Sequence, residues 1–270
     1  MLRTTLPYWP WIYKRELILI TFTSMEKTTQ VYGIRAIMEA VNSKEEIDKV
    51  FLQKGLKGDL MKELEGLLRR NEINLVYVPV EKLNRLTKNN HQGAVANISP
   101  IKFYTLEKLV EKANEKSTPA LFLLLDQLSD VRNFGAIIRT AECTGVDGII
   151  IQKKGAAPVT SDTIKTSAGA AFKVPIAKVD HIKDALFFLQ ASGIKIVSAT
   201  EKTNDSIYDI SFKEPIAIIM GAEDQGISPS ILKASDYCAK LPLLGEIKSL
   251  NVSVACAVFL YEAVRQRMSN

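Results

Sequence analysis

Short apolar runs alternate with helical patterns along most of this chain, and that alternation constrains its fold more than any other feature. The runs within residues 119–270 are rich in β-forming residues and too short to be helices, so they predict buried strands at Leu121–Leu125, Gly148–Ile151, Ile194–Ala199 and Ile216–Met220. Helical spacing of apolar residues predicts helices from Asn133 to near Gly145 and over Asp180–Ala191, Ser228–Ala234 and Asn251–Arg267. This order is typical of an α/β domain with a mostly parallel sheet.

A smaller unit with the same alternation precedes that domain. It predicts helices and strands in turn, at Ile34–Val41, Val50–Leu52, Leu60–Asn71, Leu75–Val78, Val80–Leu86 and Ala94–Ile98. We therefore expect a small α/β domain over residues 25–98 and a linker over 99–118 that contains a helix at Leu106–Lys116. The larger domain follows over 119–270.

Residues 1–24 differ from the rest of the chain. They contain both tryptophans, and their apolar stretch Leu17–Phe22 is too short for a secretory signal and lacks a small-residue cleavage site. We interpret these residues as an extension outside the fold, with Met25 as the true initiator, and a functional tail is the alternative. No apolar run in the sequence approaches the length of a membrane span.

Charge and cysteine usage narrow the class of protein only slightly. The net charge of +5 comes from the first 118 residues, which permits nucleic-acid binding without demonstrating it. The cysteines, at 143, 238 and 256, are widely spaced and form no CxxC pair, so neither a zinc site nor a disulfide framework is predicted. We expect all three to be small apolar residues in or near a core, and reduced thiols fit a cytoplasmic protein.

Common catalytic and nucleotide-binding motifs are missing from the sequence. No GxGxxG follows a strand and no GxxxxGK[ST] occurs, so a dinucleotide-binding or P-loop enzyme loses its main support. His91 and His181 have no cysteine or acidic partner at ligand spacing. A metal site or a serine–histidine hydrolase is therefore not predicted.

Three other segments place polar residues and glycines at the ends of predicted strands, where open parallel sheets bind ligands. In the first, residues 130–139, Asn133 is expected to cap a helix and Arg139 follows less than two turns later. A capped helix with one surface arginine is the simpler interpretation of this segment.

The second and third segments follow later strands. In residues 220–226, glycines allow the backbone to approach a ligand and Glu223 offers a carboxylate, although a tight strand-to-helix turn also fits. In residues 241–253, Ser249, Asn251 and Ser253 exceed what one helix cap needs, although capping alone remains an alternative.

Together and in this order, the three segments resemble the signature motifs of the SpoU (TrmH-like) ribose methyltransferases of the SPOUT superfamily. The matching residues are Asn133-Phe134-Gly135 with Arg139, Gly221-Ala222-Glu223 with Gly226, and Leu241-Pro242 with Ser249-Leu250-Asn251-Val252-Ser253. The matches have no gaps inside the motifs and cover residues 120–270.

The small domain carries a finer resemblance. Val31-Tyr32-Gly33-Ile34 and His91-Gln92-Gly93-Ala94-Val95 resemble the RNA substrate-binding domain of RlmB-type enzymes, which is similar to ribosomal protein L30e. Those enzymes methylate a guanosine ribose in 23S ribosomal RNA, whereas a related branch methylates a guanosine of tRNA, usually without this domain. The resemblance therefore favours structured ribosomal RNA as the substrate and keeps tRNA as an alternative.

The family resemblance also implies a fold and a cofactor site. It implies a deep trefoil knot at the carboxyl end and a homodimer with its sites at the subunit interface. S-adenosyl-methionine would be held in the knot, largely by the backbone around Thr200, Gly221, Gly226, Leu241, Leu243 and Leu250. No metal is expected, because this donor is already activated.

The residues that the family's motifs assign to catalysis are Asn133, Arg139, Glu223, Ser249 and Asn251. The family sometimes gives the residue matching Arg139 the role of general base, but a guanidinium is essentially always protonated in proteins. We expect Arg139 instead to hold a phosphate and stabilise charge on the 2′-oxygen, while the other residues orient it and the nucleotide. A non-catalytic RNA-binding protein and an unrelated nucleotide-binding enzyme are the competing classes.

Overall fold

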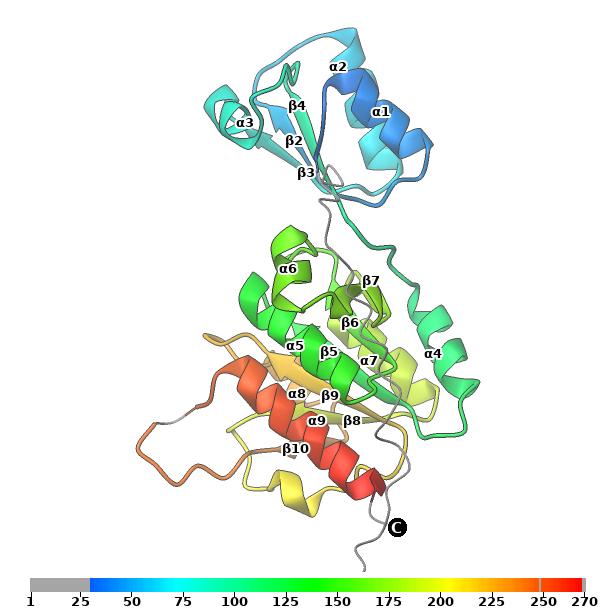
Figure 1. The fold of residues 1–270 in the computed structure, drawn as a ribbon, viewed down its shortest axis with the longest axis vertical. Coiled ribbons are helices and arrows are strands. Elements are labelled where there is room, and N and C mark those ends of the chain that lie inside the picture. Colours follow the sequence, from blue (N-terminus) through cyan, green and yellow to red (C-terminus); the bar gives the residue numbers. More distant parts are fainter. Residues whose placement is uncertain (1–29, 248, 269–270) are drawn as a thin grey trace, which may run out of the picture.

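The computed structural model describes residues 30–247 and 249–268, which form two sheets joined by one connection (Figure 1). The predicted extension over residues 1–24 and the alternative start at Met25 lie outside the described residues. Each sheet carries its own hydrophobic core, as the alternating pattern requires.

The small sheet has four strands in the order β1-β4-β2-β3. The strands are β1 (Gln30–Tyr32), β2 (Ile47–Gln53), β3 (Leu75–Val78) and β4 (Ala94–Ile98). β4 is antiparallel to both of its neighbours, whereas β2 and β3 run parallel. Side chains of β2 and β4 pack with α1 (Ile34–Asn42) and α2 (Asp59–Arg70) on one face, and α3 (Val80–Leu86) buries Leu83 against the other.

The large sheet has six strands in the order β10-β8-β9-β5-β6-β7, and every pair in it is parallel. The strands are β5 (Leu121–Asp126), β6 (Gly148–Gln152), β7 (Ile176–Val179), β8 (Lys195–Ala199), β9 (Ile216–Gly221) and β10 (Tyr237–Ala239). The sequence-based expectation of an α/β fold with a mostly parallel sheet is confirmed.

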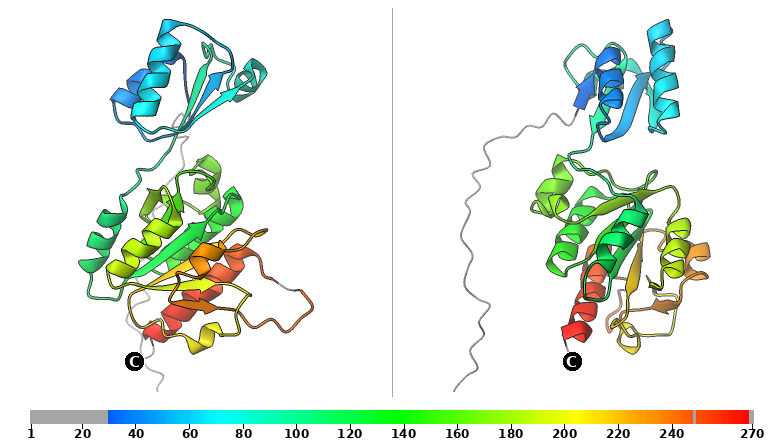
Figure 2. Two further views of the ribbon diagram at one scale, coloured as in Figure 1. Left: turned by 180° about the vertical axis from the view of Figure 1, so that it is seen from behind. Right: turned by 90° about the vertical axis from the view of Figure 1, so that its right-hand side faces the viewer.

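Helices cover both faces of the large sheet (Figures 1 and 2). They are α4 (Leu106–Asn114), α5 (Val131–Cys143), α6 (Ser161–Thr166), α7 (Ile182–Ala191), α8 (Pro229–Leu232) and α9 (Val252–Met268), with short 3₁₀ turns at Ala170–Phe172 and Ile207–Asp209. Leu123 and Leu125 of β5 pack on the face covered by α5 and α9, and Phe122 and Leu124 pack on the face covered by α4 and α7. Burial on both faces explains why β5 is a continuous apolar run.

The order of the large sheet creates one switch point, between β5 and β9. The chain moves outward from β5 to β6 and β7, and it then returns to the other side of β5 to form β8 and β9. In open parallel sheets, ligands bind outside the carboxyl ends of the strands at such a switch point, which here means the ends of β5 and β9. Two of the three polar segments directly follow these two strands.

Some local expectations were wrong. Asn133 does not cap α5, because Asp130 occupies the N-cap and its side chain accepts a hydrogen bond from the Asn133 backbone N–H. The helix expected over Ser228–Ala234 is a single turn. Cys256 lies in the core as expected, but Cys143 is exposed because it falls on the outer face at the end of α5. Other helix and strand ends differ by one to three residues, a usual error for boundaries.

Candidate active site

Three side chains, one from each of the three polar segments, meet at the switch point. The Asn133 Nδ2 donates a hydrogen bond to Glu223 Oε1 over 2.8 Å, and the Asn251 Nδ2 donates to the same oxygen over 2.7 Å. The Asn251 Nδ2 also lies 3.0 Å from Asn133 Oδ1. Residues up to 118 positions apart therefore form one polar cluster, which we call the amide–carboxylate cluster.

Local structure explains how each member of the cluster is held. Asn133 lies in the first turn of α5, where the Asp130 cap leaves its own amide side chain free to point outward. Asn251 precedes α9, and its Oδ1 accepts hydrogen bonds from the Ser253 backbone N–H and hydroxyl over 2.9 and 2.6 Å. Asn251 thus serves the helix with its oxygen and the cluster with its nitrogen.

Glu223 is carried by a tight turn that only glycine permits at its start. The Gly226 N–H donates to the Ala222 carbonyl over 2.8 Å and closes the turn. A Cβ on Gly221 would lie well inside 3.0 Å of the backbone of Gly226, which has no freedom to move away. Close approach of two backbone segments is therefore the physical reason for this glycine.

A buried aspartate that the sequence analysis missed anchors the far side of the same turn. Asp126 ends β5 and is 1% exposed, and its Oδ2 accepts hydrogen bonds from the Ser228 backbone N–H and hydroxyl over 2.9 and 2.7 Å. A carboxylate buried this deeply persists only with such partners. The sequence did contain a signal for this residue, because Asp126 is a charged residue at the end of a strand that is apolar on both faces.

Arg139 and Ser249 are not drawn into the cluster in this structure. Arg139 follows Asn133 by six residues, which places it about 9 Å further along the helix axis. Its side chain is exposed, and no described residue forms a hydrogen bond or ion pair with it. Ser249 is exposed in the segment before α9. The guanidinium of Arg139 is therefore available to an external anion.

The predicted cofactor-binding residues lie on three neighbouring segments. Thr200 follows β8, is buried, and its N–H donates to the Ala239 carbonyl over 2.9 Å. Leu241 packs partly against the core, whereas Leu243 and Leu250 are 40% and 44% exposed. Over 241–247, no described N–H donates a backbone hydrogen bond to another described residue. These main-chain groups are therefore available to a ligand.

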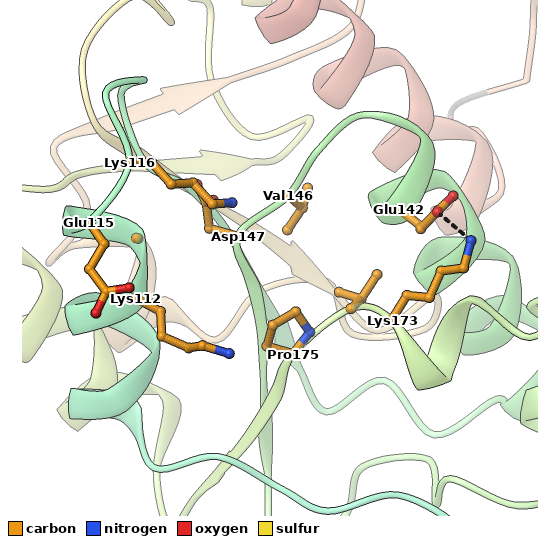
Figure 3. A pocket seen from close by; sticks show the side chains of 10 residues that line it. Lys112, Glu115, Lys116, Glu142, Val146, Asp147, Lys173 and Pro175 are labelled. Carbon is orange, nitrogen blue, oxygen red and sulfur yellow. Dashed lines mark hydrogen bonds and ion pairs between the residues drawn. The ribbon is translucent and has the colours of Figure 1, made fainter. Parts of the chain in front are cut away.

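One cavity among the described residues lies away from this site. It has a volume of about 550 Å³ and lies before the amino ends of β6 and β7, at the opposite edge of the sheet from the amide–carboxylate cluster (Figure 3). Four of its six charged side chains form ion pairs with one another, Lys116 with Asp147 and Lys173 with Glu142. No group of metal-ligating side chains gathers within the described part of the chain, and no described helix is long and apolar enough to cross a membrane.

A glycine substitution tests whether the turn shapes a ligand site. Gly221→Ala should abolish binding of S-adenosyl-methionine and destabilise the fold by about 1–3 kcal/mol, because the methyl group has no space beside Gly226. Calorimetry and urea unfolding measure the two effects. Gly66→Ala is the matched control, since its nearest neighbour is a flexible arginine side chain and alanine favours its helix. Wild-type donor affinity in Gly221→Ala would contradict the assignment.

The fold is that of an α/β protein with a cluster of polar side chains at the carboxyl end of its parallel sheet, the place where such sheets bind ligands. Comparison with known proteins identifies the family. Residues 120–261 match the model of the SpoU rRNA methylase family, and residues 30–104 match the model for RNA 2′-O ribose methyltransferase substrate binding. The chain belongs to the SpoU/TrmH family of RNA methyltransferases, as the motif resemblance predicted.

Individual relatives agree with this assignment. YacO of Bacillus subtilis, of the TrmH family of tRNA/rRNA methyltransferases, is 32% identical over 88% of this chain and 95% of its own length. The crystal structure of the SpoU methyltransferase AviRb from Streptomyces viridochromogenes, in complex with AdoMet, matches with a TM-score of 0.58 and 25% identity, covering 89% of this chain and 91% of that one. The Aquifex aeolicus TrmH/SpoU tRNA-modifying enzyme matches over 60% of this chain and 84% of its own, with a TM-score of 0.52 and 30% identity.

Proposed function

We propose that this protein transfers a methyl group from S-adenosyl-methionine to a ribose 2′-hydroxyl of structured RNA, and that its substrate is a guanosine of 23S ribosomal RNA. The observation that carries the proposal is the amide–carboxylate cluster at the switch point, in a chain of this family. A methyl-transfer assay on unmodified RNA tests it. Such a substrate places the enzyme in the cytoplasm.

The donor site fits the residues beside the cluster. Thr200, the Gly221–Gly226 turn and the segment from Leu241 to Leu250 offer backbone groups and apolar side chains, which suit an adenine held by main-chain contacts. When bound, S-adenosyl-methionine supplies a methyl group already activated on its sulfonium. The protein then needs only to position the ribose hydroxyl and stabilise its oxygen.

The charge of each side chain in the site determines the role that we assign to it. Arg139 holds the phosphate next to the target ribose and stabilises negative charge on the 2′-oxygen, whose proton is released to solvent water. Glu223 accepts both amide hydrogen bonds on Oε1, so its Oε2 is free of partners among the described residues and can accept a hydrogen bond from the ribose. Asn133 and Asn251 hold that carboxylate, and Ser249 contacts the nucleotide beside it.

One end of the small domain supports RNA as the substrate. The two segments that resemble the RNA-binding domain meet there, because the Gly33 N–H donates to the Ala94 carbonyl and the Gln53 N–H donates to the Gly93 carbonyl. The His91 ring is fixed between Asn84 and the Gly93 N–H, at 2.9 and 3.0 Å. These loops form one surface with a fixed shape.

Exposed cations surround these loops. They are Arg35, Lys54, Lys57 and Lys88, and none forms an ion pair with a described residue. Tyr32 is 38% exposed beside them and offers a ring on which a base can stack. Unpaired cations around an aromatic side chain suit the phosphates and unstacked bases of RNA. We call this surface the loop surface.

Charge reversal on the loop surface should weaken RNA binding without touching the site. We expect Lys57→Glu with Lys88→Glu to lower affinity for ribosomal RNA at least tenfold and to flatten its salt dependence, because phosphate contacts release counterions. Donor affinity should not change. Filter binding at several salt concentrations measures this, and Lys108→Glu on the exposed side of α4 is the control. An unchanged affinity and salt slope would assign RNA binding to another surface.

We further propose that the enzyme is a homodimer with a trefoil knot at its carboxyl end, as the family resemblance implies. An exposed apolar stripe on α9 supports the dimer: Val254 and Tyr261 are 50% and 54% exposed and border a groove with Tyr208. A stripe of this kind on a long helix is typical of a contact between subunits. The carboxyl-terminal knot stays a prediction.

A guanosine of tRNA is the second candidate substrate. The Aquifex aeolicus tRNA-modifying enzyme matches only 60% of this chain, whereas the match to the RNA substrate-binding model covers residues 30–104. That additional domain, which we assign to residues 25–98 with 99–118 as the linker, favours ribosomal RNA. The domain at 119–270 is assigned to donor binding and catalysis.

A further inference from the structure

A half-buried ion pair joins the two domains. The Lys178 Nζ, from β7 of the large sheet, lies 2.7 Å from Asp48 Oδ1, from β2 of the small sheet, and each side chain is only 18% exposed. In every other ion pair between described residues, at least one of the two side chains is 50% exposed or more. Screening by salt is weaker for a half-buried pair than for exposed ones.

The surroundings hold Lys178 in this position. Its Nζ lies 4.0 Å from the centre of the Phe103 ring, which belongs to the linker. The linker is itself fixed to both domains, because the Ser99 N–H donates to the Glu46 carbonyl over 2.7 Å and the Tyr104 N–H donates to the Ile176 carbonyl over 2.8 Å. Burial raises the pKa of Glu46, and the positive charge of Lys178 opposes that rise.

A second lysine of the large domain repeats the arrangement. The Lys153 Nζ, just after β6, lies 3.4 Å from a carboxylate oxygen of Glu72 in the small domain and 3.1 Å from one of Asp180. These hydrogen bonds raise the pKa of Lys153, with Asp180 the larger cause. Both Lys153 and Glu72 are more exposed than Lys178 and Asp48, so the second contact is the weaker one.

The two contacts hold the small domain over one particular edge. Lys178 and Lys153 lie near the carboxyl ends of β7 and β6, the edge that also carries the amide–carboxylate cluster after β5 and β9. Asp48 lies near the start of β2, beside the last residues of β4, whereas the loop surface is at the opposite end of the same strands. Figure 1 shows the small domain beyond this edge.

We propose that Lys178 is a positioning residue for the methylation reaction: its ion pair with Asp48, supported by Lys153 and Glu72, fixes the small domain so that RNA bound on the loop surface presents one ribose to the cluster. The inference rests on the proposed function. The proposal also defines the class of substrate. It is an RNA in which a rigid folded structure separates the element that binds the loop surface from the ribose that is methylated.

The loop surface lies far from the ion pair, so a small rotation of the small domain would displace it by several ångströms. Five residues of β2 separate its start from the loop surface, which is about 17 Å of strand. A rotation of about 10° at the linker would then move the loop surface by about 3 Å. Misplacement of a substrate by about 1 Å can cost about a hundredfold in rate, so loss of the pair should be visible in catalysis.

The experiment uses the full chain with three variants. Lys178→Met and Asp48→Asn remove the attraction, and the double variant Lys178→Asp with Asp48→Lys reverses it. We expect each single variant to lower kcat/KM on folded ribosomal RNA by about tenfold to a hundredfold, and the reversed pair to recover at least part of it. Lys173→Met is the matched control, because Lys173 pairs with Glu142 inside the large domain. A reversed pair no better than the single variants would overturn the proposal.

Two further readouts separate positioning from a general structural role. On a short RNA fragment that reaches only the large domain, Lys178→Met should match the wild type, and an equal loss on both substrates would overturn the proposal. Spin labels at positions 63 and 233, both exposed, measure the distance between the domains after Cys143→Ser and Cys238→Ser remove the accessible thiols. We expect a narrow distribution of distances between the two labels in the wild type and a broader one in Lys178→Met. An unchanged distribution would contradict the proposal that the ion pair fixes the small domain. This measurement needs no methyl transfer, so it remains decisive if the proposed function fails.

Discussion

Arg139→Ala should lower the rate of methyl transfer by about 10²–10³ or more while donor affinity stays within a few-fold of the wild type. The arginine lies on α5 beyond the cluster, is exposed, and has no hydrogen-bonding or ion-pair partner among the described residues. Its removal should therefore leave the fold intact and take away one contact to phosphate and developing charge. Single-turnover transfer to ribosomal RNA fragments measures the rate, and calorimetry measures donor binding.

Two further variants test whether the loss of rate is specific to the guanidinium of Arg139. Arg139→Lys keeps a positive charge but lacks the planar fork, so it should be severely impaired too. Arg132→Ala removes an exposed arginine two turns earlier on the same helix, outside the matched motif, and should cost less than about tenfold. A wild-type rate in Arg139→Ala rejects the assignment. Full activity in Arg139→Lys, with the pH profile moved down to the pKa of lysine, would favour a general base instead.

Asn251→Asp should be almost as damaging, because it separates the two roles of this residue. A carboxylate oxygen can still cap α9 through the Ser253 N–H, but both donated hydrogen bonds to Glu223 and Asn133 are lost. A second carboxylate within 3 Å of Glu223 would also force one of the pair to take up a proton or swing away. We expect transfer to fall by about a hundredfold and the unfolding free energy to change by less than about 1 kcal/mol.

A control for this substitution lies in the same cap. Ser253→Ala removes one hydroxyl that donates to Asn251 Oδ1 but keeps the backbone N–H contact and all three hydrogen bonds of the cluster. Its transfer rate should stay within a few-fold of the wild type. If Asn251→Asp loses stability in proportion to activity, or keeps full activity, the cluster has no role beyond capping.

The meeting of the three cluster residues could be anticipated from sequence, whereas their roles and those of Arg139 and Ser249 stay predictions. Asn133, Glu223 and Asn251 each fall where a strand ends or a helix begins, and the rule for parallel sheets brings such ends together. The local sequence pattern could not predict that Asn133 and Asn251 form a hydrogen bond with each other, because they are 118 positions apart. Propensity also could not choose between Asp130 and Asn133 as the cap of α5, since both residue types suit it.

Other features depend on tertiary contacts that leave no local trace. Asp126 is buried because Ser228 reaches it from another crossover, and nothing near Asp126 in the sequence announces that partner. The ion pair between Lys178 and Asp48 joins strands of different sheets, and each residue alone resembles an ordinary exposed charge. Strand order likewise follows from packing of whole crossovers rather than from any one segment.

The most direct test of the central claim is the chemical position of the transferred methyl group. Unmodified total RNA from a strain that lacks this protein is incubated with the purified enzyme and S-adenosyl-methionine carrying a labelled methyl. The RNA is then digested to nucleosides and mapped. We expect the label on the 2′-oxygen of a guanosine in 23S ribosomal RNA, and none when Arg139→Ala replaces the wild type. Label on a base, or no transfer to any RNA by a folded enzyme that binds the donor, would contradict the account.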